Sequence, residues 1–193
     1  TKHAKIAGLL IGISVVANIQ IENKYVGAML FSVALLTIIH NNLPLYTGKI
    51  GFLSRKNFKD NLVDLLNMLF DNSLYAFIPS LIYVMYDIRF ENKLAEIALN
   101  KFGKTPLQLF LYATLCGVLM FVAVYSKNQL ITVFCIMTFI LSGFEHCIAD
   151  VPYLIVNFSK DSIIKYGMIV LGNTFGAIVA RKLIVQEKEI YEE

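Results

Sequence analysis

The sequence predicts an all-α membrane protein with six transmembrane helices in two halves of three, and three observations indicate this. Hydrophobic residues make up 57% of the chain against 16% charged residues, and the mean hydropathy is positive, which is unusual for a water-soluble domain. Six apolar windows approach the roughly 20 residues that a spanning helix needs. The second and fifth windows are interrupted. Because backbone groups in lipid must be hydrogen-bonded internally, we expect helices rather than open strands.

The windows of the first half run from Ala4 to Ile19, from Tyr25 to Tyr46 and from Leu62 to Tyr86. The first follows two basic residues, Lys2 and Lys5, but no small-residue cleavage pattern comes after it, so we do not expect a signal peptide. Since the chain begins at Thr1 rather than at a methionine, we expect residues to be missing before it.

The windows of the second half run from Leu107 to Tyr125, from Leu130 to Val156 and from Ile163 to Val185. The third and sixth windows share a short pattern of Asn, hydroxyl, apolar, any residue and Ala, beginning at Asn72 and Asn173. We therefore expect one domain over residues 1–193, built from repeats over about 4–86 and 106–185. Three spans per half is an odd number, so the halves are expected to be inverted across the membrane.

Each half has one interrupted window in the same ordinal place. The second window runs into Pro44 and Gly48 beside polar residues, and the fifth contains the polar run from Ser142 to Pro152. A broken helix frees backbone N–H groups that an anion can use, and broken spans in matching positions indicate a transport site. The alternative for the first break is a helix end followed by a loop.

The run Gly143-Phe144-Glu145-His146-Cys147-Ile148-Ala149-Asp150 resembles the fifth-helix signature of the formate/nitrite transporter family. Leu45-Tyr46-Thr47-Gly48 is similar to that family's second-helix break, and Asn72 and Gly172-Asn173 match its paired helical asparagines. The resemblance implies a homopentamer in which each protomer has its own pore and an aquaporin-like inverted-repeat fold. It also implies transport of small monovalent anions.

The resemblance further implies which residues form the site. Thr47 and His146 are expected to face each other near the pore centre, with Lys101 in the same polar system and Asn72 and Asn173 as further pore residues. The departures from the family pattern are Asp150 and Gly117 where the family has Asn, Lys49 after the first break, and Pro152 after the second.

His146 is the strongest single candidate, because ionisable groups inside a membrane are costly and usually functional. Its ordinary pKa of about 6.5 suits a group that meets a weak-acid anion. It could offset the anion's charge or deliver a proton, and both readings stay open; the alternative is a hydrogen-bonded core histidine. Thr47 could instead stabilise a turn, and Lys101 could be a solvated surface lysine. Glu145 is expected to have a buried partner such as a backbone N–H.

Apolar side chains near the two breaks could form constrictions that block hydrated ions. The candidates are Phe31, Leu35, Leu45, Tyr46 and Phe139. Ordinary helix packing is the alternative for each of them.

Ten of the 17 basic residues lie on the side of the termini, with Arg55, Lys56 and Lys59 as the densest group. This predicts cytoplasmic termini in a plasma or inner membrane. The expected transported ion is of the formate/nitrite class, with hydrosulfide or another weak-acid anion as the alternative and a non-transporting scaffold as the alternative class. With three His and no HExxH or CxxC pattern, we expect no enzyme, no metal and no cofactor. Lipid is the expected surrounding, and nucleic acid is not an expected partner.

Overall fold

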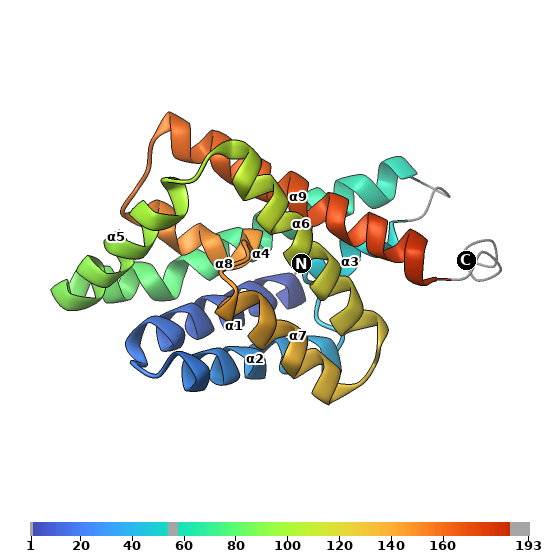
Figure 1. The fold of residues 1–193 in the computed structure, drawn as a ribbon, viewed down its shortest axis with the longest axis horizontal. Coiled ribbons are helices and arrows are strands. Elements are labelled where there is room, and N and C mark those ends of the chain that lie inside the picture. The colour runs from blue at the N-terminus through green and yellow to red at the C-terminus, as the bar shows by residue number, and fades with distance from the viewer. Residues whose placement is uncertain (1, 54–57, 186–193) are drawn as a thin grey trace.

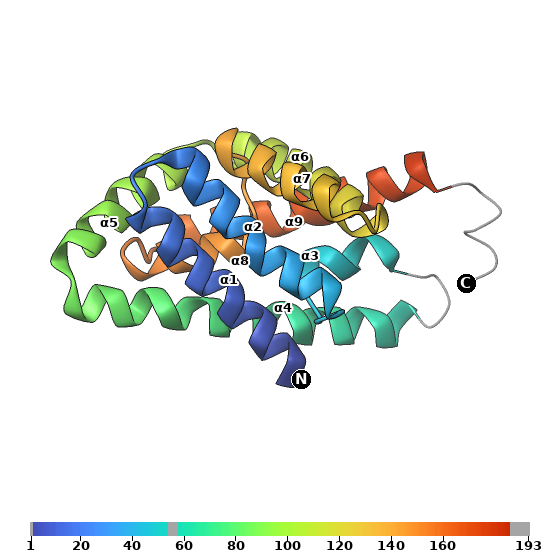
Figure 2. The same ribbon diagram turned by 90° about the horizontal axis from the view of Figure 1, so that it is seen from below.

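A computed structural model describes residues 2–53 and 58–185, and the regular elements within these ranges are all helical. Six apolar helices lie in these ranges: α1 (Lys2–Gln20), α2 (Lys24–His40), α4 (Phe58–Tyr86), α6 (Pro106–Tyr125), α7 (Gln129–Leu141) and α9 (Lys160–Ile184). Figure 2 shows α4 running along the long axis with α1 crossing it obliquely, and Figure 1 shows α6 crossing this axis obliquely. Four of them, α1, α4, α6 and α9, are long and apolar enough to cross a membrane, whereas α2 and α7 are shorter apolar helices. The chain is a multi-pass membrane protein.

The two shorter helices are those predicted to break. After α2, residues 41–45 are non-helical, and the chain then forms α3 (Tyr46–Lys49) and the 3₁₀-helix η1 (Ile50–Phe52). After α7, residues 142–146 are non-helical, and α8 (Cys147–Asp150) and the 3₁₀-helix η2 (Val151–Ile155) follow. Both predicted breaks are therefore present, and the first is not a simple helix end, because a buried helical turn resumes after it.

Two helix pairs carry most of the packing, α1 with α4 and α6 with α9. Each pair approaches closely at a glycine. A Cβ atom built on Gly8 would lie 2.2 Å from the carbonyl oxygen of Asn72, and one on Gly117 would lie 2.3 Å from that of Asn173. Glycine at both positions lets the two helix backbones come together beside the two asparagines.

The sequence did not predict the further helix α5 (Ile88–Phe102), which lies at one end of the bundle in Figure 2. Asp87 caps it, since its side chain accepts the N–H groups of Phe90 and Arg89, and these bonds lower the pKa of this carboxyl. The buried residues of α5 recur every fourth position: Phe90, Leu94, Ala98 and Phe102. This amphipathic helix brings Lys101 toward the interior.

The basic group that contributed most to the predicted orientation lies largely outside the described residues. Arg55 and Lys56 belong to the segment 54–57, and Lys188 and the end of the chain also lie beyond the described ranges. Cytoplasmic termini stay a prediction.

Candidate functional site

The chain leaves α2 and α7 through the same kind of turn. Asn42 and Gly143 adopt φ angles of 51° and 68°, in the left-handed region that Gly and Asn enter most easily. At the following residue, the N–H groups of Leu43 and Phe144 donate to carbonyls five residues earlier, each at 2.9 Å. This turn ends both helices and redirects the chain.

Two buried asparagines hold the chain beyond these turns. Asn72 Oδ1 accepts the N–H of Tyr46 at 2.8 Å, and Asn173 Oδ1 accepts the N–H of Cys147 at 2.8 Å. Each asparagine follows its partner by 26 residues. Their NH₂ groups donate to the carbonyls of Ala4 and Pro44 in one half, and of Ala113 and Glu145 in the other.

These contacts change two expectations. The breaks were expected to free backbone N–H groups for an anion, but the N–H groups of Tyr46 and Cys147 each donate to an asparagine side chain. Asn72 and Asn173 were expected as pore residues, but both are fully buried and neither lines the two cavities described below. The structure gives them a role in fixing the breaks.

The two breaks meet at Thr47 and His146. Thr47 Oγ1 lies 2.9 Å from His146 Nε2, and both side chains are buried. The other ring nitrogen, Nδ1, accepts the Ala149 N–H at 3.2 Å, where His146 caps α8. Because Nδ1 is an acceptor, the proton of the ring lies on Nε2 and is donated to Thr47. Both nitrogens of the neutral ring are thus engaged, and protonating Nδ1 would break its bond to Ala149.

Aromatic rings cover the histidine on one side. The Phe139 ring stacks on His146 with centroids 5.6 Å apart and planes at 16°, and Phe31 meets Phe139 edge-on with centroids at 6.1 Å. Of the other predicted constriction residues, Leu45 lines the larger of the two cavities described below. Leu35 is fully buried and lines neither cavity. Tyr46 also lines neither cavity, and its hydroxyl lies 2.8 Å from Thr174 Oγ1 on α9.

A cluster of alternating charges lies beside His146. Lys101 Nζ contacts a carboxylate oxygen of Glu145 and, at 2.9 Å, Asp150 Oδ1, while Lys104 Nζ lies 2.9 Å from the other Glu145 oxygen. A partner was expected for the buried Glu145, with a backbone N–H as one candidate; in the structure two lysines pair with it. Burial lowers the pKa of Lys101, but Asp150 and Glu145 outweigh it and raise that pKa above its ordinary value. Lys101 is charged and is not a solvated surface lysine.

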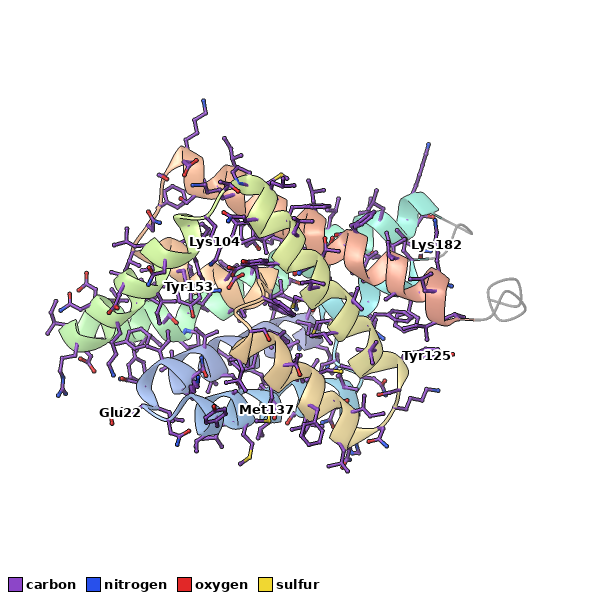
Figure 3. All side chains as sticks on the ribbon, viewed as in Figure 1. Glu22, Lys104, Tyr125, Met137, Tyr153 and Lys182 are labelled. Carbon is purple, nitrogen blue, oxygen red and sulfur yellow. The ribbon has the colours of Figure 1, made fainter. Side chains whose placement is uncertain are left out.

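Two cavities open on either side of the Thr47–His146 contact. The α5 cavity, of about 300 Å³, is lined by residues that include Lys101, Lys104, Phe31, Phe139, His146 and Asp150. The α9 cavity, of about 1150 Å³, is lined by residues that include Leu45, Lys49, Val124, Lys127, Arg181 and Val185. Figure 3 places Lys104 and Tyr153, from the α5 cavity, toward the opposite end of the long axis from Tyr125, from the α9 cavity.

Comparison with known families matches residues 2–186 to the formate/nitrite transporter family. This chain belongs to the formate/nitrite transporter family. The solved structure of an "FNT family ion channel" superposes with a TM-score of 0.76 at 19% identity, covering 100% of this chain and 89% of that chain. A "pentameric formate channel with formate bound" superposes with a TM-score of 0.76 at 20% identity, covering 99% of this chain and 96% of that chain. A search of curated proteins found no match.

Membership of the formate/nitrite transporter family supports the expectation that the protein is a transporter rather than an enzyme. Two departures from the family pattern now have a physical account. Gly117 allows the contact between α6 and Asn173, which a larger side chain would obstruct. Asp150 adds a second carboxylate to Lys101, and one of its oxygens, Oδ2, is buried without a hydrogen-bond partner among the described residues.

Reasoning from sequence missed Lys104 and the pairing of Asp150. One signal was available: two carboxylates in one apolar span, Glu145 and Asp150, require cationic partners. Lys101 and Lys104 lie three residues apart at the end of α5, but neither the helix nor its place beside the fifth window was predicted.

Proposed function

We propose that this protein conducts small monovalent anions of the formate/nitrite class through a pore within each protomer. The observation that carries the proposal is the hydrogen bond between Thr47 and His146, which joins the two helix breaks between cavities at opposite ends of the bundle. Membership of the formate/nitrite transporter family supports the same function.

The path runs from the α5 cavity past Phe31 and Phe139 to the Thr47–His146 pair, and past Leu45 into the α9 cavity. Phe31, Phe139 and Leu45 are almost fully buried, so an ion must shed water to pass between them. A singly charged ion loses far less hydration free energy than a multiply charged one. The Thr47 hydroxyl and the His146 Nε2–H are the polar groups offered at the centre.

The proposal includes an assembly. One relative of this fold is a pentameric formate channel, so a homopentamer is the expected assembly here. The matched asparagine contacts in the two halves support an inverted, aquaporin-like repeat within a single domain. The proposed location is a plasma or inner membrane with both termini in the cytoplasm, and the excess of basic residues on the side of the termini supports it.

The test is a flux assay in proteoliposomes with formate, nitrite, hydrosulfide, acetate and lactate, each at two pH values. Flux of formate or nitrite above that of protein-free liposomes is the expected result. Faster flux of hydrosulfide than of either would favour the alternative anion. If none of the five anions crosses in a correctly folded preparation, the proposal fails and a non-transporting scaffold remains.

A further inference from the structure

The α9 cavity carries a concentration of positive charge that conduction of formate-sized ions does not require. Its lining includes two exposed lysines, Lys49 and Lys127, and Arg181, whose guanidinium donates to the Leu53 carbonyl at 3.0 Å, together with the polar Asn128 and Gln129 at the start of α7. No Asp or Glu is among the described residues that line it. At about 1150 Å³ it is large enough for an organic ligand and far larger than a formate ion needs.

The other cavity provides a direct comparison. The α5 cavity also has lysines in its wall, but both Lys101 and Lys104 are paired with carboxylates that belong to the same cluster. Two lysines and two carboxylates sum to no net charge there. The two ends of the proposed pore therefore differ: the lysines of the α5 cavity are paired with carboxylates, whereas Lys49 and Lys127 of the α9 cavity have no carboxylate partner among the described residues.

The inner end of the α9 cavity is apolar. Leu45 and Val124 line it, and Leu45 is 2% exposed. An ion with two or more negative charges is attracted by the cationic wall, but it cannot give up its hydration to enter the constriction. Such an ion would be retained in the cavity.

We propose that the α9 cavity is a binding site for multiply charged oxyanions of the phosphate class, and that an ion bound there blocks anion flux from that side. The block rests on the proposed function, but the binding does not. Inorganic diphosphate is the probe, and ADP tests whether an organic molecule that carries the same group is also accepted.

Binding is measured by calorimetry on the full chain in detergent, at constant ionic strength. The variant is Lys49→Gln combined with Lys127→Gln, because both lysines are exposed and their loss should not disturb folding. The matched control is Lys93→Gln, an exposed lysine of α5 that lines neither cavity. We expect diphosphate to bind the wild type and the control equally, and the double variant about tenfold more weakly.

Flux is measured in proteoliposomes of known protein orientation, with diphosphate on one face at a time. Block of formate flux only from the face on which α9 ends is the expected result. The inference is overturned if diphosphate does not bind, if the double variant binds it as tightly as the control, or if both faces block equally. Binding that appears only after removal of residues 186–193 would also overturn it, since the chain's own acidic segment would then be the occupant. Absence of formate flux with binding intact would instead count against the proposed function alone.

Discussion

At the scale of the residue, His146 has both ring nitrogens engaged, one by the Ala149 N–H and one by Thr47. Phenylalanine at this position keeps a ring to stack on Phe139 but has neither nitrogen. His146→Phe is expected to lower anion flux about tenfold or more and to remove most of its pH dependence, because it deletes both a donor and the titrating group. Flux of formate across a pH series, in liposomes with equal amounts of assembled protein, measures this.

Thr47→Val is the companion variant. It removes the hydroxyl but no titrating group, so flux should fall while the shape of the pH profile is kept. A His146→Phe protein that assembles normally and retains both the rate and the pH profile of the wild type would contradict the central role of this residue.

The charged cluster gives a second prediction at this scale. Glu145 is fully buried between Lys101 and Lys104, whose side chains are 17% and 26% exposed. Glu145→Gln should lower the free energy of unfolding by about 2 to 4 kcal/mol, less than for a wholly buried pair because both lysines reach the cavity. Asp161→Asn is the control, since this carboxylate pairs with Lys165 but is 69% exposed, and it should cost less than about 1 kcal/mol. Equal thermal shifts for the two variants in detergent would show that the cluster does not contribute to stability.

Sequence reasoning found Thr47 and His146 because each lies in a motif that breaks a helix. It could not find Lys104, because 41 residues separate it from Glu145 and no local pattern joins them. It assigned the asparagines to the pore but could not predict their bonds to the backbone of the breaks, because a motif gives the type of a residue and not the direction of its side chain.

At the scale of the element, the contact of α6 with α9 depends on the absence of a side chain at Gly117. Gly117→Ala should destabilise the protein by about 1 to 3 kcal/mol, because the new Cβ would collide with the Asn173 carbonyl. Gly167→Ala on α9 is the control: a Cβ added there would meet no neighbouring group within 4 Å, so the helix-favouring alanine should be neutral or slightly stabilising. Thermal unfolding in detergent compares them, and a Gly117 variant as stable as the Gly167 variant would rule out the close approach.

The membrane helices were predicted closely because an apolar run of spanning length has few alternatives in a chain of this composition. The predicted third window, for example, ends at Tyr86, where α4 ends. Helix α5 was missed because its mixed polar and apolar sequence resembles a connecting segment. Two features of the sequence could have indicated this helix: the apolar residues at every fourth position from Phe90 to Phe102, and Asp87 as the N-cap.

At the scale of the whole molecule, each protomer has a mass of 21.8 kDa, and the expected assembly is five times that mass. Many apolar side chains of α4, such as Phe70 and Leu74, are exposed in the single chain, as is expected for a surface that meets lipid or another protomer. Native mass spectrometry or light scattering corrected for detergent measures the mass. A monomer or dimer under conditions that preserve the fold would contradict the pentamer.

Stoichiometry is the property that sequence reasoning could reach only through resemblance. No repeated heptad or small-residue stripe in the sequence indicates five subunits. The charge difference between the two cavities was likewise hidden, because it depends on which lysines meet carboxylates after folding.

The asparagine contacts separate the residues that hold each bend from the residue at its tip. Leu45 comes just before the N–H that Asn72 accepts, and His146 comes just before the N–H that Asn173 accepts. The same backbone support thus presents a hydrocarbon in one half and an imidazole in the other. Both asparagines bond only backbone groups, so neither of them selects the side chain of Leu45 or of His146. The two halves therefore share one way of holding the backbone and differ in the side chain that each break carries, so the chemistry of the pore is set by single residues at these two positions.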